Sequence, residues 1–401
     1  MNYRERELAT LEFSNDGLDR GAVLESMGPW IKTVNAFKEQ GFDVGFTDEL
    51  RSPVLPTENL FYATRPHAEW ERYYNTMKTE MVCKYETTLG WDPLKRVSFR
   101  IPFVSYDEKI LEDTAEHILR YDRDGWVRRY VKGRELVEEI TPVVTDWETW
   151  EKHKQHTREQ LAIHCTPENM EKAYGRYRDG DVNFSIRFRI AGFFWLIRDL
   201  MGVEEHLVTY MLEPDLIKDI NRFQLDIYKE QLDGILKIIR PGTLFFEEDY
   251  SGANGPMISP ELFSEFISPC YREIIPFLKE RGVGQVFLDT DGDFTAMIPT
   301  MMECGIDGVL PVDVNAGVDI VKVREAYPNL KFWGGFDKLA LVTDTAAIEA
   351  EFRRLMPVIR QGGCIICTDH QAAPHTPLEN YRYYVKRLRE VMSECRGEKA
   401  R

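Results

Sequence analysis

The second half of the chain alternates short apolar runs with longer stretches of helical periodicity. Between the runs, apolar residues recur at the three- and four-residue spacing of an amphipathic helix, as in 214–239 and 345–361. Strands that alternate with helices in this way indicate a parallel sheet that is covered by helices. The runs predicted as strands are 184–190, 243–248, 285–288, 308–312, 331–333 and 364–367.

The first 160 residues follow a different pattern, in which aromatic-rich helical stretches flank a strand-like part. Segments 97–106 and 121–131 are predicted as antiparallel strands, because Asp124-Gly125 is a strong turn signal. The predicted helices are 21–40, with a start at Gly28-Pro29, 67–89 and 146–160.

These patterns predict an α/β fold, a (β/α)8 TIM barrel with an N-terminal helical and antiparallel-strand extension. Six strand–helix units are visible, and earlier segments supply the remaining two. Residues 1–160 would pack as a helical and β-hairpin section on 161–401, the main part of the barrel, to give one structural unit. A doubly wound nucleotide-binding sheet is disfavoured, because the chain contains neither GxGxxG nor GxxxxGK[ST].

Two of the predicted strands end in side chains that can carry chemistry. Asp289 and Asp291 follow one strand on the same side, and His370 follows the last strand. Two like charges this close require a cation, a shared proton or a basic partner. Because barrel active sites lie at the carboxyl ends of the strands, we predict that these three residues converge on one mouth of the barrel. The next acid, Asp293, is predicted to cap the following helix.

Other strand ends add further candidates. Strand 243–248 runs into three consecutive acids, of which at most two can face the barrel axis; Glu248 is a catalytic candidate. Arg187 and Arg189 alternate with apolar residues, so they either face inward as a fork for a substrate carboxylate or lie on a solvated sheet face. The remaining predicted substrate contacts are Tyr250, Asp313 and Asn315.

Composition limits the classes of binding partner and the cellular compartment that we expect. The chain of 401 residues has 67 acidic and 51 basic residues and a net charge of −16, which disfavours nucleic acid and anionic membranes as partners. Seven scattered cysteines are typical of reduced thiols in a cytosol. No apolar run approaches the roughly 20 residues that a bilayer requires, and Met1–Glu7 lacks the apolar core of a signal peptide. We expect a cytoplasmic protein; a homodimer stays open.

Several motifs resemble the uroporphyrinogen decarboxylase superfamily. They are Leu288-Asp289-Thr290-Asp291-Gly292-Asp293, Gly334-Gly335-Phe336-Asp337-Lys338, Gly363–His370 and Thr376–Tyr381, together with Asp122-Arg123-Asp124-Gly125 and the stretch to Trp150. The resemblance covers the chain from about residue 95. It implies a (β/α)8 barrel with its site at the C-terminal mouth.

The superfamily contains two activities. True decarboxylases carry an arginine motif of the form Met-Arg-Gln-Ala-Gly-Arg, which this chain lacks. Another branch contains zinc methyltransferases that exchange methyl groups with a corrinoid protein. The zinc-holding His-x-Cys of its thiol-methylating members falls on Asp289-Thr290-Asp291, and their last Cys falls on or near His370. Two oxygens and one nitrogen make a harder ligand set, which suits a substrate that presents oxygen.

The resemblance therefore implies a methyltransferase that demethylates a small methoxylated, aromatic compound and passes the methyl group to cob(I)alamin on a corrinoid protein. Asp289, Asp291 and His370 would hold zinc, or would bind and protonate the leaving oxygen without a metal. Two alternatives stay open. One is a decarboxylase-like lyase acting on a carboxylic acid, with Arg187 or Arg189 holding the carboxylate. The other is a non-catalytic barrel that binds a tetrapyrrole or corrinoid.

Overall fold

The main sheet of the chain has seven strands, and every neighbouring pair is parallel. They are described by a computed structural model that covers residues 1–13, 18–45, 78–99, 106–132, 136–178 and 183–397. The strand order is β1 (Leu94–Phe99), β6 (Ser185–Ala191), β7 (Thr243–Glu247), β10 (Gln285–Thr290), β11 (Gly308–Pro311), β12 (Lys331–Trp333) and β13 (Cys364–Ile365). All six strands predicted in the second half are thus confirmed, and the fold is TIM-barrel-like.

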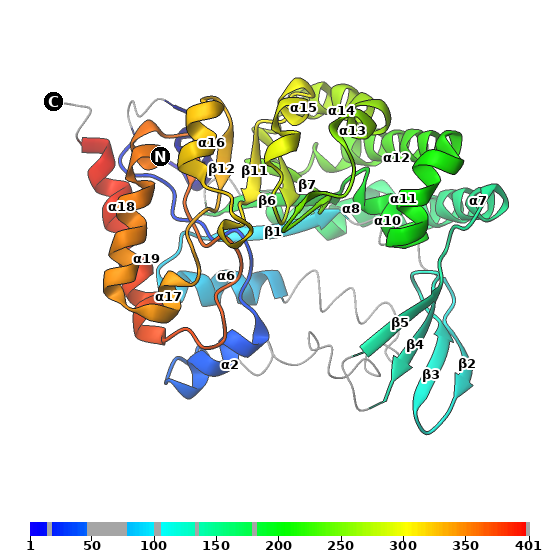
Figure 1. Ribbon diagram of the computed structural model, residues 1–401, viewed down its shortest axis with the longest axis horizontal. Helices are drawn as coiled ribbons and strands as arrows, with labels where there is room; N and C mark the ends of the chain where they lie inside the picture. Colours follow the sequence, from blue (N-terminus) through cyan, green and yellow to red (C-terminus); the bar gives the residue numbers. More distant parts are fainter. Residues whose placement is uncertain (14–17, 46–77, 100–105, 133–135, 179–182, 398–401) are drawn as a thin grey trace.

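Helices lie around this sheet (Figure 1). The longest, α12 (Pro214–Ile235), begins with proline at its first turn and buries a stripe that includes Leu216, Ile217 and Ile220. The others after β6 are α10 (Trp195–Met201), α11 (Val203–Leu212), α13 (Pro260–Phe266), α14 (Ser268–Glu280), α15 (Ile298–Glu303), α16 (Ile320–Ala326), α17 (Ala340–Thr343), α18 (Thr345–Gln361) and α19 (Leu378–Gly397).

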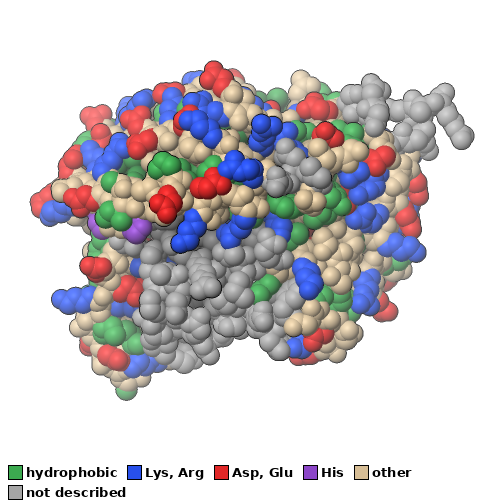
Figure 2. All heavy atoms as spheres, turned by 180° about the vertical axis from the view of Figure 1, so that it is seen from behind, with side chains coloured by type: hydrophobic (Ala, Val, Ile, Leu, Met, Phe, Trp, Pro, Cys, Tyr) green, Lys and Arg blue, Asp and Glu red, His purple; other side chains and the backbone are tan. Residues whose placement is uncertain are grey.

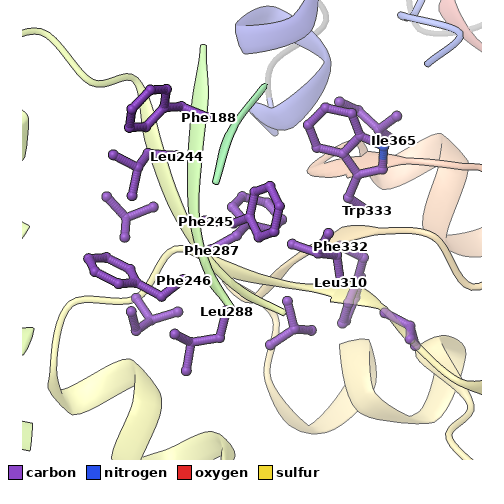
Figure 3. Close-up of a cluster of buried hydrophobic side chains, with 14 of the residues drawn as sticks. Phe188, Leu244, Phe245, Phe246, Phe287, Leu288, Leu310, Phe332, Trp333 and Ile365 are labelled. Atoms are coloured by element: carbon purple, nitrogen blue, oxygen red, sulfur yellow. The ribbon is translucent and has the colours of Figure 1, made fainter. Parts of the chain in front are cut away.

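Side chains alternate between the two faces of the sheet. Figure 3 shows Leu244 and Phe246 on one side of β7 and Phe245 on the other. The ring of Phe246 lies 5.0 Å from that of Tyr271 on α14, so its face is the outer one. Phe245 therefore faces the barrel interior, and the parallel register places Arg189 beside it on that face. Arg187, two residues earlier on β6, shares the interior face, which excludes the solvated-face alternative for both arginines.

The front of the chain forms helices and a second sheet. The antiparallel order is β2 (Lys109–Asp113), β3 (His117–Tyr121), β4 (Val127–Val131) and β5 (Leu136–Thr141), and this sheet stands off from the barrel at the lower right of Figure 1. Gly125 has φ +86° and donates its N–H to Asp122 O (3.0 Å), which confirms the predicted turn between β3 and β4. The helices here are α1 (Tyr3–Leu11), α2 (Ile31–Glu39), α6 (Lys78–Leu89), α7 (Trp147–His164) and α8 (Pro167–Tyr174). Two residues each form β8 (Ser251–Gly252) and β9 (Gly255–Pro256).

Two predicted elements at the front differ from the structure. The antiparallel strand predicted for 97–106 is wrong in its first part, because β1 pairs in parallel with β6; residues 100–105 lie outside the described chain. The helical pattern predicted for 21–40 is a helix only from Ile31, close to the start predicted at Gly28-Pro29. The segment 22–25 instead has no regular structure and is wholly buried, and a segment buried on all sides has no periodicity that separates strand from helix.

The same segment 22–25 lies between the first and last strands of the sheet. Val23 O accepts a hydrogen bond from Asp92 N (2.8 Å), just before β1, and Glu25 accepts one from Thr368 Oγ1 (3.2 Å), just after β13. It thus fills the gap that an eighth strand of a closed barrel would occupy, without being a regular strand. The helix predicted for 67–89 is described from Lys78 onward as α6, and its earlier part lies outside the described residues.

The division of the chain near residue 160 stays a prediction, although β1, from the front section, is a strand of the barrel sheet. Figure 2 shows Lys and Arg side chains interspersed with Asp and Glu over the upper part of one face. Within the described parts of the chain, every helix is too short or too polar to cross a membrane.

Candidate active site

An acid and an arginine lie together inside the barrel. Asp289, on β10, is 8% exposed, and its Oδ2 lies 3.8 Å from Nη2 of Arg187. The guanidinium carbon of Arg187 lies 4.1 Å from the ring centroid of Phe245 and 5.6 Å from that of Trp333. Burial raises the pKa of Asp289 to about 7, although the positive charge of Arg187 opposes the rise. The pair therefore places a group that can hold or release a proton near neutral pH beside a cation.

A second acid lies at the mouth. Asp291 receives no hydrogen bond at its buried Oδ1 from any described residue, and its backbone N–H donates to Asp249 Oδ1 (3.2 Å). His370 Nε2 lies 3.8 Å from Asp291 Oδ2. Burial raises the pKa of Asp291, and the charge of Asp249 adds to the rise. The charges of Asp249 and Asp291 both also raise the pKa of Asp289, so these acids lie near one another. With His370 beside Asp291, the residues predicted to converge (Asp289, Asp291 and His370) lie around one end of the barrel.

Local backbone geometry holds this mouth together. Asp249 has φ +38°, a conformation that is uncommon for a residue other than glycine, and Nη1 of Arg198 donates to its carbonyl oxygen (3.0 Å). Gly292 has φ +75°, and a Cβ there would lie 2.5 Å from the carbonyl carbon of Gly252. Glycine after Asp291 is thus required for the close approach of the 252 turn.

The three consecutive acids after β7 point to different places. Glu247 pairs with Arg189 on the inner face. Glu248 lies on the helix side, where its oxygens accept from three backbone N–H groups at and just before the first residue of α10 and from a tyrosine hydroxyl: Phe193 (3.0 Å), Phe194 (2.8 Å), Trp195 (3.0 Å) and Tyr271. Burial raises the pKa of Glu248 to about 7. Its oxygens are occupied in holding α10, so the structure does not bring it to Asp289; its catalytic role stays a prediction.

The remaining predicted contacts are spread more widely. Tyr250 is fully buried and donates to the sulfur of Met301 (2.6 Å), within the core. Asp313 accepts from Asn315 N (3.0 Å) and so caps the short 3-10 helix η5 (Val314–Ala316). The Asn315 amide donates in turn to Asp369 Oδ2 (2.9 Å). Asn315 thus reaches the residue before His370, whereas Tyr250 does not face the mouth.

Sequence reasoning missed several residues at the mouth. Asp369 is buried and also accepts from Lys338 N (3.0 Å) and Lys338 Nζ (3.4 Å). The ring of Trp30 meets the imidazole of His370 edge-on, with 5.8 Å between centroids. Nothing in the sequence around Trp30, which directly precedes α2, indicates that its side chain would contact a residue that follows the last strand. Asp293 is predicted from the sequence to cap the next helix; its Oδ1 accepts from Thr295 N (2.9 Å) in an Asx turn, but the N-cap position of the 3-10 helix η4 (Thr295–Met297) is Phe294.

The predicted zinc ligands are not gathered as a metal site. Over the described ranges, no three His, Cys, Asp or Glu side chains come close enough together to hold a metal ion. Asp289 instead faces Arg187, and a cation beside a ligand carboxylate competes with a metal for it. Zinc at Asp289, Asp291 and His370 stays a prediction, and holding it would require these side chains to move together.

Comparisons with known proteins agree with the fold. The sequence model of the uroporphyrinogen decarboxylase (URO-D) family matches residues 200–391. A methyltransferase from Methanosarcina mazei is similar in structure, with a TM-score of 0.60 and 15% sequence identity over 100% of both chains. A protein named as a vitamin-B12-independent methionine synthase from Listeria monocytogenes has a TM-score of 0.41 and 12% identity, over 93% of this chain and 97% of its own. No curated protein matched.

The matched range begins within α10 and runs to α19, so it contains Asp289, Asp291 and His370 but not Arg187. The structural likeness at 15% identity supports the barrel fold across the whole chain. Residues 200–391 are therefore similar in sequence to the uroporphyrinogen decarboxylase family, and the chain has a TIM-barrel-like fold.

Proposed function

We propose that this protein is a methyltransferase that removes the methyl group of a small methoxylated, aromatic compound and passes it to a corrinoid protein. The observation that carries the proposal is the buried Arg187–Asp289 pair in the barrel interior, in which the Arg187 guanidinium lies near the rings of Phe245 and Trp333. An acid beside a cation, flanked by aromatic rings, suits an aromatic substrate whose oxygen must leave with its bonding electrons.

Asp289 is the proton donor in this reaction. The bond between the methyl carbon and the ether oxygen breaks, its electron pair stays on the oxygen, and Asp289 supplies the proton that makes the phenol. Arg187 stabilises the negative charge that develops on that oxygen. A cob(I)alamin acceptor on the partner protein would supply the electron pair of the new bond to the methyl carbon. Asp291 and His370, which are more exposed, would return a proton to Asp289 from solvent.

Zinc is a proposal on the same residues. Bound by Asp289, Asp291 and His370, it would supply Lewis-acid polarisation of the ether oxygen. Because these side chains do not gather as a metal site in the described chain, the steps above use only the protein's own groups. Elemental analysis of the purified protein tests the metal directly.

The test is methyl transfer from methoxybenzoates to cob(I)alamin, followed by the change in the cobalamin absorption spectrum. We expect transfer by the wild type and a loss of roughly 100-fold or more in Asp289→Ala, with a smaller loss in His370→Ala. Full activity in both variants would remove the proposal. Absorbance that instead shows tight corrinoid binding by this chain, without turnover, would favour the non-catalytic barrel.

A lyase is the second candidate, and a specific observation favours it. Nε and Nη1 of Arg187 have no hydrogen-bond partner among the described residues, and Nη2 lies 3.8 Å from Asp289, so the guanidinium has N–H groups to offer to a substrate carboxylate. In that reaction the carbon–carbon bond breaks, carbon dioxide leaves, and Asp289 protonates the resulting carbanion. Release of carbon dioxide from candidate acids, without methyl transfer, would separate the two functions.

A further inference from the structure

We infer that the barrel interior contains an anion-binding subsite built from Arg187 and Trp333, and that the substrate carries a carboxylate which this subsite binds. The part that concerns the substrate rests on the proposed methyl transfer. The subsite itself rests on hydrogen-bond donors that the described protein leaves unused.

Arg187 is the first source of unused donors. Its side chain lies on the interior face of β6 and is 4% exposed. Nε and Nη1 have no hydrogen-bond partner in the described chain, and Nη2 lies 3.8 Å from Asp289, which is too far for a hydrogen bond. A buried guanidinium without hydrogen bonds is costly, so a ligand that supplies acceptors gains the stabilisation that the protein does not provide.

The neighbouring interior arginine provides a contrast. Arg96 lies directly opposite Arg187 in the register of β1 and β6. It donates to both carboxylate oxygens of Glu86 (2.8 Å each) and to the backbone oxygens of Glu25 (2.9 Å) and Ser26 (3.4 Å). The protein thus provides hydrogen-bond acceptors for Arg96 but not for Nε and Nη1 of Arg187. Of these two arginines, Arg187 is the one available to a ligand.

Trp333 is the second source. It is fully buried at the end of β12, and its Nε1 has no hydrogen-bond partner in the described residues. Figure 3 shows it in one cluster of buried side chains with Phe245 and Ile365. The guanidinium carbon of Arg187 lies 5.6 Å from the centroid of the Trp333 ring. The groups without a hydrogen-bond partner on both residues are N–H donors.

This inventory determines the class of ligand. A cation or a donor-rich ligand would leave the N–H donors of Arg187 and Trp333 without acceptors. A carboxylate supplies both the acceptors and a compensating negative charge. The planar fork of Arg187 matches two carboxylate oxygens, and the rings of Phe245 and Trp333 beside it suit a flat aromatic body. The geometry thus favours an aromatic carboxylate over a neutral methoxyarene.

Calorimetric titration of the full chain with 4-methoxybenzoate and with its uncharged, isosteric 4-methoxybenzamide tests the subsite. We expect the wild type to bind the carboxylate about tenfold or more tightly than the amide. Arg187→Gln should remove this preference, Arg187→Lys should reduce it because lysine keeps the charge but not the fork, and Trp333→Phe should lower carboxylate affinity while keeping the ring. The matched control Arg222→Gln, which removes a charge from an exposed arginine on α12, should keep the wild-type preference.

Three results would overturn the inference: no preference in the wild type, no binding of either probe, or a preference that survives Arg187→Gln or, if that variant does not fold, survives Arg187→Lys unchanged. The proposed function fails separately. Carboxylate-selective binding without methyl transfer keeps the subsite and removes the methyltransferase, whereas methyl transfer that accepts both probes equally keeps the methyltransferase and removes the subsite.

Discussion

Oδ2 of Asp289 lies 3.8 Å from Nη2 of Arg187, close enough for strong attraction and too far for a hydrogen bond. The two come from neighbouring parts of one face, Arg187 early on β6 and Asp289 near the end of β10. Burial pushes the pKa of the acid up to about 7 and that of the arginine down to about 10, while each charge opposes the shift of the other. This balance between burial and attraction sets the protonation of the proposed acid.

Removing the cation should shift that balance. In Arg187→Gln the attraction that lowers the pKa of Asp289 is lost, so this pKa should rise above about 7 and the acid form should persist to higher pH. The alkaline limb of the pH–rate profile for methyl transfer should therefore move to higher pH, while the maximal rate falls. A limb that stays in place would mean that another group sets it.

Asp289 should also make folding stability depend on pH. Its folded pKa of about 7 lies above the ordinary value of 3.8, so the stability that it contributes is present below pH 3.8 and is lost as the pH rises through 7. Asn cannot ionise, so the stability of Asp289→Asn relative to the wild type should grow by about 2–3 kcal/mol between pH 5 and pH 8. Urea unfolding at the two pH values measures it; a difference that does not change with pH would contradict the assignment.

We expect Glu248 to contribute mainly to folding stability rather than to catalysis. Glu248→Ala removes the acceptor of three backbone N–H groups at the start of α10 and of the Tyr271 hydroxyl, which should cost about 3 kcal/mol in urea unfolding. The matched control Glu261→Ala, in the exposed first turn of α13, should change stability little. A Glu248→Gln enzyme that is stably folded yet loses most of its turnover would instead support the catalytic role predicted from sequence.

The strained backbone at Asp249 offers a further check. Both Asp249→Gly and Asp249→Ala lose the acceptor of the Asp291 N–H, but only glycine adopts φ +38° without strain. The glycine variant should be the more stable by about 1 kcal/mol in thermal unfolding. In both variants the pKa of Asp291 should fall, since the charge of Asp249 helps to raise it; carboxyl titration by NMR would measure this. Equal stability of the two variants would show that the backbone relaxes.

The sequence predicts the residues at the barrel mouth well where the two-residue period of a strand determines which way the side chains point. Asp289 and Asp291 follow a buried run, so the two-residue period places both at the carboxyl end of one strand, and the last run delivers His370 to the same end. The period alone could not decide which of Glu247, Glu248 and Asp249 turns inward, because that depends on where β7 ends and on the unusual backbone of Asp249.

Other features depend on contacts between distant segments. Nothing in the local pattern of 22–25 separates a buried helix from an irregular segment that fills a gap between β1 and β13. Trp333 reads as an ordinary core residue in an apolar strand, and only the three-dimensional arrangement shows that its Nε1 lacks an acceptor. The orientation of Arg187 likewise follows from the register with β7, which a single sequence does not contain.

The most direct measurement is single-turnover methyl transfer from 4-methoxybenzoate to cob(I)alamin by the wild type and by Asp289→Asn, with folding of both verified by circular dichroism. We predict that the wild type forms methylcobalamin and the phenol in equal amounts, and that Asp289→Asn is slower by roughly 100-fold or more. Transfer at the wild-type rate in Asp289→Asn, or no transfer by the folded wild type, would contradict the proposed reaction.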